Sequence, residues 1–391
     1  MLLLPSAWAK PRFKVLASVP GGLWTGLTLD AKGNLYGVTS GGGTNSVGSV
    51  FELSGNSKGK WSVTALHSFD GTDGSSPNGN LIFDAAGNLY GTANDGGLYD
   101  RGTVFELTPG SGGWSFNVIY NFCSELDCPD GAEPDDGLTL DKAGNLYGTA
   151  GGGGAYDYGV AYELTPTSGG WSESVLYDFG SKPYDATAST APLIFSEAGD
   201  LYDTSNAGGN YHLGTIFKLV HRAEGWKERI LYSFCRKGGY LCKDGAGPEG
   251  GAVFDAQGRL FGTTHGGGAD TCYGASCGTV FKVTPEQGGR WKEAVLYNFA
   301  DAEKGFEPVS GVVFDTAGNL YGTTALGGTG GCDSGCGVVY KLAPKARGGW
   351  ACTVLHKFNG TDGGLPDGGV ILDKRGNLYG TAYTTVFEVT P

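Results

Sequence analysis

The amino-acid sequence predicts an all-β fold, a seven-bladed β-propeller with four antiparallel strands in each blade. Three observations lead to this fold class. A short motif occurs seven times at a steady spacing, large side chains occupy neighbouring positions in the motif strand, and each end of the chain carries part of one repeat. The abundance of glycine, 73 of 391 residues, fits many tight turns between short strands.

The repeated unit is an apolar strand that ends in Asp, two further residues, and then Gly-Asn-Leu-Tyr-Gly-Thr. Clear copies, some with one changed residue, lie at residues 30–37, 84–91, 141–148, 315–322 and 373–380. Two degenerate copies lie at 196–203 and 255–262. The first motif glycines of successive copies are 54 to 60 residues apart, which indicates seven copies of one structural unit.

Each unit contains four predicted strands, named A to D in chain order; in the third unit they cover 137–141, 145–150, 159–165 and 171–179. The Asp-x-x-Gly-Asn turn joins A to B, because the carboxylate accepts backbone N–H groups and glycine tolerates positive φ. Leu146 and Tyr147 are neighbours in strand B and point to opposite faces, so both faces of the sheet must be covered. Blades packed face to face around an axis meet that requirement, whereas a sandwich sheet has one polar face.

The ends of the chain predict a closed ring. Residues 13–19 have the pattern of a strand D with no A, B or C before them, and the last unit ends after its strand C at 385–389. We therefore expect Val15 and Leu16 to pair with Val386 and Phe387 and to complete the seventh blade. Residues 10–391 then form a single propeller domain. Residues 1–9, which end in Ala7-Trp8-Ala9, are expected to be the remnant of a signal peptide.

The motif and the segment that follows it resemble a known family. Gly-Asn-Leu-Tyr-Gly-Thr followed by Gly-Gly, and then Gly-Thr-Val-Phe-Glu-Leu at 102–107, is similar to the Gloeo-Verruco ("GloVer") tandem-repeat family of exported, β-propeller-like proteins. The resemblance covers about residues 13–390. It implies export, often with a carboxy-terminal sorting anchor, and it implies no biochemical role. Because Pro391 ends this chain directly after strand C, we expect a freely secreted or periplasmic protein.

The charge balance restricts the partners. The chain carries 27 basic and 40 acidic residues, a net charge of −13. Such a surface repels phosphate backbones and anionic lipid, so we expect no nucleic-acid partner and no membrane-surface role. No segment is long and apolar enough to span a membrane, and we expect a monomer without a cofactor, although a bound cation stays open.

The nine cysteines favour an oxidising compartment. Eight of them form short-range pairs in Gly-rich loops: Cys123 with Cys128, Cys235 with Cys242, Cys272 with Cys277, and Cys332 with Cys336. Close pairs of this kind are typical of disulfides in extracellular or periplasmic proteins. Zinc is the alternative, but the spacings differ from the usual two-residue knuckles, so we predict no metal site. Cys352 has no predicted partner.

One face of the predicted ring carries the candidate site. Antiparallel order places the D–A and B–C loops of every blade on one face and the short A–B and C–D turns on the other. The B–C loops combine glycines with aromatic and polar residues, a mixture that suits a sugar or an extracellular protein. The predicted ligand-binding residues are Asn94, Asp95, Tyr99, Asp100, Tyr156, Asp157, Asn210, Tyr211, His212, His265 and Asp270. The alternative is that these residues only pack and cap Gly-rich turns.

Catalytic motifs are few. His67 and His356 occupy a strand-D position that holds Tyr in other blades, so we expect them to be structural. His212 and His265 remain candidates for acid–base or metal chemistry. Carboxylates in the D–A loops are candidates for glycosidic cleavage: Asp70, Asp73, Asp127, Asp130, Glu133, Asp135, Asp136, Glu249, Glu307, Asp362 and Asp367.

The fourth motif copy has lost three of its usual residues, with Ser196, Asp200 and Asp203 in their places. Drift in a tolerant copy and recruitment of an aspartate to a site both explain this. For the whole protein, we favour a secreted or periplasmic binding protein that uses the loop-rich face. The alternative is a propeller hydrolase or lyase that acts on polysaccharide, and no catalytic residue is assigned.

Overall fold

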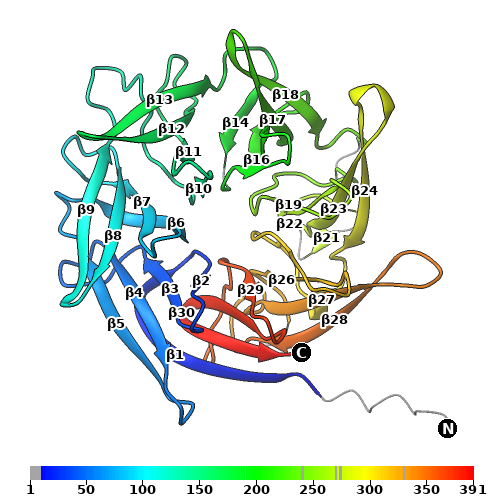
Figure 1. The fold of residues 1–391 in the computed structure, drawn as a ribbon. Helices are drawn as coiled ribbons and strands as arrows, with labels where there is room; N and C mark the ends of the chain where they lie inside the picture. The colour runs from blue at the N-terminus through cyan, green and yellow to red at the C-terminus, as the bar shows by residue number, and fades with distance from the viewer. Residues whose placement is uncertain (1–9, 190, 239–241, 269–270, 273–274, 329–330) are drawn as a thin grey trace.

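The computed structural model describes residues 10–189, 191–238, 242–268, 271–272, 275–328 and 331–391. It is a ring of seven blades, each with four antiparallel strands, which confirms the predicted seven-bladed β-propeller (Figure 1). The described residues contain no α-helix, only the two 3-10 turns η1 (Gln287–Gly289) and η2 (Ala302–Lys304). The nine residues predicted to be a signal-peptide remnant lie outside the described residues.

The strands follow one another from the channel to the rim of each blade. The first three blades are β2 (Thr28–Leu29), β3 (Leu35–Thr39), β4 (Ser49–Gly55) and β5 (Trp61–Ser68); β6 (Ser75–Phe83), β7 (Leu89–Asp95), β8 (Thr103–Gly110) and β9 (Gly113–Asn121); and β10 (Thr139–Leu140), β11 (Leu146–Ala150), β12 (Val160–Thr167) and β13 (Gly170–Asp178). The fourth contains β14 (Ala186–Ser189), β15 (Ile194–Phe195), β16 (Leu201–Gly208), β17 (Thr215–Arg222) and β18 (Gly225–Ser233), with β14 and β15 together in the place of strand A.

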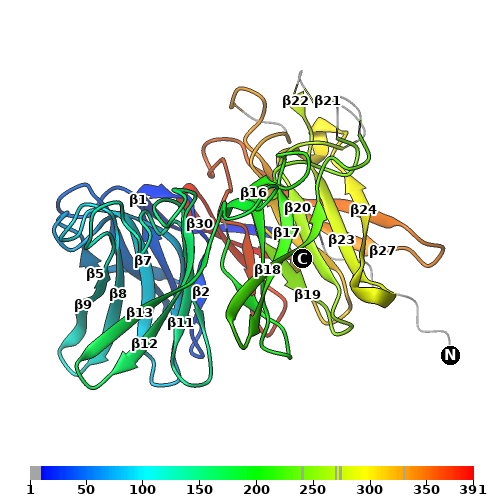
Figure 2. The ribbon, with the colours of Figure 1, turned by 90° about the horizontal axis from the view of Figure 1, so that it is seen from above.

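The remaining blades follow the same order. The fifth is β19 (Ala252–Phe254), β20 (Leu260–Thr264), β23 (Thr279–Pro285) and β24 (Trp291–Asn298), and the sixth is β25 (Val313–Phe314), β26 (Leu320–Thr324), β27 (Val338–Pro344) and β28 (Trp350–Lys357). The seventh is β29 (Val370–Leu372), β30 (Leu378–Thr390) and β1 (Arg12–Leu23). The small hairpin of β21 (Thr271–Cys272) and β22 (Ala275–Ser276) projects from the upper edge of the ring in Figure 2.

The motif residues each have a local role. In the first blade, Asp30 Oδ1 accepts the backbone N–H groups of Lys32 and Asn34, both at 2.8 Å. Asp30 Oδ2 accepts the Asn34 side-chain amide at 3.0 Å, and Gly33 has a φ of 91°. The same bonds recur at Asp84, Asp141, Asp315 and Asp373. The turn therefore explains the Asp, the Gly and the Asn of the motif without any functional role.

The second motif glycine allows an aromatic ring of strand C to lie over strand B. A Cβ atom at Gly91 would lie 2.6 Å from Cζ of Phe105. The flanking Leu89 and Tyr90 are both buried although they point to opposite faces of the blade. Blade-to-blade packing thus covers both faces, as the pattern of large neighbours predicted.

The ring is closed by the N-terminal strand. β1 pairs antiparallel with β30, with Val15 opposite Phe387 and Ala17 opposite Val386. β30 supplies both strand B and strand C of this blade, because its chain reverses near Tyr383, which has a φ of 49°. Across the two halves of β30, Tyr379 Oη donates a hydrogen bond to Glu388 Oε1 at 3.3 Å. β1 lies along the outer edge of β30 in Figure 1, so the predicted closure is confirmed.

Three of the predicted cysteine pairs are disulfides: Cys123–Cys128, Cys235–Cys242 and Cys332–Cys336. Cys277 is also disulfide-bonded, and the side chain of Cys272, its predicted partner, lies outside the described residues. Cys352 is a free, half-buried thiol.

No helix among the described residues is long and apolar enough to cross a lipid bilayer.

Candidate functional site

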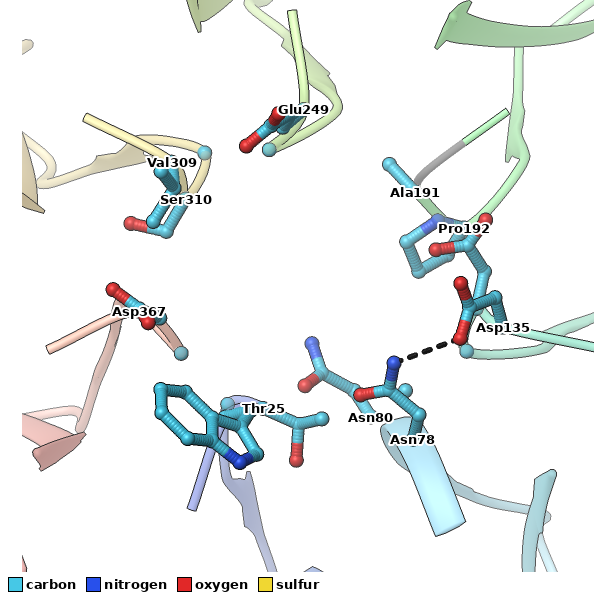
Figure 3. A pocket seen from close by; sticks show the side chains of 18 residues that line it. Thr25, Asn78, Asn80, Asp135, Ala191, Pro192, Glu249, Val309, Ser310 and Asp367 are labelled. Atoms are coloured by element: carbon cyan, nitrogen blue, oxygen red, sulfur yellow. Dashed lines mark hydrogen bonds between the residues drawn. The ribbon is translucent and has the colours of Figure 1, made fainter. Parts of the chain in front are cut away.

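The end of the central channel on the D–A loop face is a cavity of about 400 Å³ (Figure 3). All seven blades contribute. Five of them do so through the short segment that directly precedes strand A, the second through residues of β6, and the fourth through the link between β14 and β15. Figure 3 shows Glu249 and Asp367 on one side and Asn78, Asn80 and Asp135 on another, with their polar groups around a common space. Trp24 adds an aromatic surface that is 40 % exposed.

Glycine allows the blades to approach one another closely around this cavity. A Cβ atom at Gly250 would lie 2.0 Å from the backbone nitrogen of Gly311, and one at Gly368 would lie 2.1 Å from the carbonyl oxygen of Thr25. Only a residue without a Cβ atom fits such a backbone contact. The cavity wall is therefore built from backbone segments of neighbouring blades that touch directly.

Hydrogen bonds from the motif threonines hold these segments in position. Thr92 Oγ1 donates to the carbonyl oxygens of Asn78 and Asp136, at 2.7 and 2.9 Å. Thr263 and Thr381 each donate to a carbonyl of the following blade, at 2.7 and 2.8 Å. The Thr92 bond to Asn78 lies within one blade, and the other three join neighbouring blades. Together they hold the cavity in one shape before any ligand arrives.

One position of the repeat carries most of the chemistry of the cavity. It lies six residues before the turn Asp and holds Trp24, Asn78, Asp135, Glu249, Val309 and Asp367 in six of the blades. The motif around this position is nearly constant, whereas the position itself ranges from an indole to a carboxylate. Such variation distinguishes it from the structural positions of the repeat.

Amides and a carboxylate meet on the side of the cavity formed by the second and third blades. Asp135 Oδ1 accepts hydrogen bonds from Asn78 Nδ2 and Asn94 Nδ2, both at 2.9 Å. Asp136 lies behind Asp135, buried, and accepts a hydrogen bond from Thr149 Oγ1 at 3.1 Å. Burial and the nearby carboxylates hold the pKa of Asp136 well above its usual range. This side thus presents a hydrogen-bond acceptor with fixed orientation.

A second polar group surrounds Glu249 on the opposite side. Glu249 Oε1 accepts a hydrogen bond from Asn206 Nδ2 at 2.5 Å and lies 3.1 Å from His265 Nδ1. The hydrogen bond to Glu249 raises the pKa of His265. Burial, together with the charges of Glu249 and Glu307, raises the pKa of Asp367 to about 6. Asp367 therefore loses its proton at a higher pH than an ordinary aspartate does.

Two of the predicted ligand-binding residues lie at the edge of the cavity. Asn94 donates a hydrogen bond to Asp135, and His265 contacts Glu249; both carboxylates line the cavity. The tyrosines Tyr99, Tyr156 and Tyr211 lie farther out, exposed on the B–C loops. The backbones of two others are held in the blade. Asp95 is paired with Ser75 in the β-sheet, and the Asn210 N–H donates a hydrogen bond to Ser233 Oγ. Asp270 lies outside the described residues.

Three other predicted residues share a backbone conformation. Asp100, Asp157 and His212 have φ values of 58°, 59° and 56° at equivalent points of their loops. Positive φ favours Asn, Asp and His among residues other than glycine. The turn alone therefore accounts for these three side chains, and their role in binding stays a prediction.

Several D–A loop carboxylates serve the strand-D residues. Asp73 binds His67 at 2.7 Å and Asp362 binds His356 at 3.0 Å, while Asp130 accepts a bond from Tyr120 at 2.7 Å. The same contact, between a D–A loop aspartate and a strand-D His or Tyr, thus occurs in three blades, which indicates a structural role. In the fourth blade, Asp200 pairs with Lys218 and Asp203 is buried against Ser189, so neither aspartate lines the cavity.

Sequence reasoning missed Trp24, Asn78 and Asn80. Trp24 precedes the first complete repeat, and its ring meets that of Tyr383 at 5.2 Å. The signal that identifies the site is the variable position before strand A, compared across the seven copies. Within the described parts of the chain, no three His, Cys, Asp or Glu side chains are grouped to hold a metal ion.

Two solved structures are similar to this chain. The chain is similar to the crystal structure of an ancestral GH74 enzyme, with a TM-score of 0.61 and 11 % identity over 95 % of this chain and 48 % of that one. It therefore spans about half the length of that enzyme, and the likeness shows the fold. A luciferin-regenerating enzyme matches with a TM-score of 0.49 and 14 % identity, over 97 % of this chain and 95 % of that one.

No curated protein matches the chain. The Gloeobacter/Verrucomicrobia repeat matches residues 16–140, 124–288 and 193–388, which together span almost all of the propeller. The chain belongs to the Gloeobacter/Verrucomicrobia repeat family.

Proposed function

We propose that this protein is an exported glycan-binding protein and that the cavity at the channel mouth is its binding site. The observation that carries the proposal is the composition of that cavity. It joins the half-exposed indole of Trp24 to fixed amide and carboxylate groups from other blades. An aromatic face packs on the C–H face of a sugar ring, and oriented polar groups bond its hydroxyls.

Export is supported by the cysteines and by the family resemblance. Three short-range disulfides, Cys123–Cys128, Cys235–Cys242 and Cys332–Cys336, lie in loops. Disulfides of this kind persist in oxidising compartments and are rare in reducing ones. The family is one of exported proteins by the resemblance stated above. We place the protein outside the cytoplasm, in the periplasm or the medium.

Replacing Trp24 by Ala is expected to weaken glycan binding by about tenfold or more, because the variant loses the apolar surface under the sugar. Trp24→Phe keeps an aromatic ring and is the matched control, with an expected loss of about threefold or less. A glycan array selects the oligosaccharide, and isothermal titration compares the wild type with both variants. Equal affinity of wild type and Trp24→Ala, or no binding to any glycan, would contradict the proposal.

A second candidate is a polysaccharide hydrolase or lyase at the same cavity. The specific observation is that Asp367, whose pKa burial raises to about 6, lines the same cavity as Glu249, which lies 3.1 Å from His265 Nδ1. Two carboxyl groups in different surroundings within one cavity are typical of the acid and the base in glycoside cleavage.

Mass detection after incubation with polysaccharide separates the two candidates. Binding alone predicts that the polysaccharide stays intact with wild type and with Asp367→Asn alike. Released fragments with wild type, and none with Asp367→Asn, would replace the binding proposal by the enzymatic one.

A further inference from the structure

The B–C loops of three consecutive blades present one tyrosine each in the same way. The loops join β7 to β8, β11 to β12 and β16 to β17, in blades that lie side by side in Figure 1. They share the pattern Gly-Gly-x-Tyr-x-x-Gly, at residues 96–102, 153–159 and 208–214. Tyr99, Tyr156 and Tyr211 occupy the same position of this pattern and form what we call the tyrosine arc.

The three loops have one conformation. Both glycines of the pair, the residue after the tyrosine and the final glycine have positive φ in every copy. The final glycine N–H donates to the first glycine carbonyl at 3.0 to 3.3 Å in all three: Gly102 to Gly96, Gly159 to Gly153, and Gly214 to Gly208. The loops are therefore equivalent, and the tyrosines repeat at the period of the blades.

A strand-D side chain anchors each loop directly before its tyrosine. The backbone N–H of Leu98 donates to Asn121 Oδ1 at 2.9 Å, that of Ala155 to Asp178 Oδ1 at 2.8 Å, and that of Asn210 to Ser233 Oγ at 3.3 Å. The rings are thus mounted on a fixed backbone. A rigid aromatic surface loses little conformational entropy when a partner packs on it.

Neither packing nor turn capping accounts for these tyrosines. Their side chains are between 43 and 51 % exposed and form no hydrogen bond or ring contact with another described residue. The first blade has a similar loop, and there the equivalent Asn45 donates to the carbonyl of Phe69 at 2.9 Å. Asn45 thus serves its own loop, whereas the three tyrosines face solvent.

We infer that the tyrosine arc binds a neutral linear polysaccharide that extends outward from the channel-mouth cavity; this rests on the proposed function. Equivalent rings at a regular interval match a partner that itself repeats. The net charge of −13 disfavours an anionic polymer such as a polyuronate. The arc lies on the same face as the cavity, since B–C and D–A loops share that face. The ligand is therefore a chain of several sugars, with one part in the cavity and the rest across blades two to four.

The test compares short and long neutral glycans. The probes are glucan, xylan, mannan and galactan, each as trisaccharide and as soluble polymer, with polygalacturonate as the anionic counterpart. In a triple variant, Tyr99, Tyr156 and Tyr211 are replaced by Ala. The matched control replaces Leu98, Leu126 and Leu213 by Ala, which removes exposed apolar side chains from the same face without removing a ring. Thermal unfolding verifies that both variants are folded.

We expect the wild type to bind one neutral polymer about tenfold or more tightly than the corresponding trisaccharide. The tyrosine variant should lose that gain and keep its trisaccharide affinity within about twofold, while the leucine variant matches wild type. Equal affinity for trisaccharide and polymer, or no effect of the tyrosine variant, overturns this inference and leaves the cavity proposal standing. Stronger binding of polygalacturonate than of every neutral polymer also overturns it. Absence of binding to all neutral probes overturns both proposals.

Discussion

The protein is expected to unfold at a lower temperature at pH 9 than at pH 5, because several buried carboxyl groups must ionise as the pH rises. Asp203 replaces the motif glycine in the fourth blade and is buried, with Ser189 Oγ donating to it. Burial raises the pKa of Asp203 to about 8. Burial also raises the pKa of Glu173 to about 7 and that of Glu228 to about 9.

The sign of the effect follows from proton binding. Each group has a folded-state pKa above its unfolded value, so its contribution to stability is complete below pH 4 and is lost as the pH rises to the folded pKa. For Asp203 this window extends from 3.8 to about 8. In contrast, the hydrogen-bonded turn carboxylates Asp255 and Asp315 have lowered pKa values and lose their contribution only at acid pH. Maximum stability is therefore expected between about pH 4 and 5.

Asp203→Asn should remove much of this pH dependence. A shift of one pKa unit corresponds to about 1.4 kcal/mol, so Asp203 alone changes the free energy of unfolding by roughly 2 to 5 kcal/mol after local relaxation. For a chain of this length that is about 3 to 6 °C in Tm. The measurement is thermal unfolding of wild type and Asp203→Asn at pH 5, 7 and 9. A wild-type Tm that is constant from pH 5 to 9 would contradict the burial argument.

Deleting residues 10–19 is expected to abolish the cooperative fold. The deletion removes the part of β1 that carries Leu16 and Val19, both buried against the seventh and first blades, and Phe13, whose ring stacks on His356 at 3.5 Å. It also leaves the outer edge of β30 unpaired. The lost apolar burial amounts to roughly 5 kcal/mol or more, which is comparable to the total stability of many domains.

Adding the missing strand as a separate peptide tests whether closure is the cause. A peptide of residues 10–19 should restore the far-UV circular dichroism signal and a cooperative thermal transition to the truncated protein. The control peptide carries Leu16→Asp and Val19→Asp and should not restore either signal, because both side chains enter the core. If the truncated protein unfolds like the full chain without any peptide, the ring does not depend on this strand.

The architecture was predictable because its determinants are local and repeated. The Asp30 turn, the buried Leu146–Tyr147 neighbours and the phase of the two chain ends each constrain the fold from a few adjacent residues. Because the pattern occurs in seven copies, it can be recognised even where one copy has lost some of its residues. The fourth copy shows this, since the blade forms although Asp203 stands where glycine is usual.

Contacts between blades were not predictable, because their partners lie far apart in the sequence and no sequence pattern sets their register. Phe116 stacks on His67 at 3.6 Å from the next blade, whereas Glu293 takes the equivalent position and lies 3.5 Å from Tyr232. The cavity was not predictable for the same reason, since residues from different blades line it. Trp24, Asn80 and Asp367 become neighbours only when seven blades close around the channel.

The most direct test of the channel-mouth binding site is the crystal structure of the protein with a bound oligosaccharide chosen from the glycan array. We expect a sugar ring against Trp24, with its hydroxyls bonded to polar groups of the cavity such as Asn78, Asp135 or Asp367. A sugar bound at any other surface, with the cavity filled only by water, would contradict the assignment of the channel mouth as the binding site.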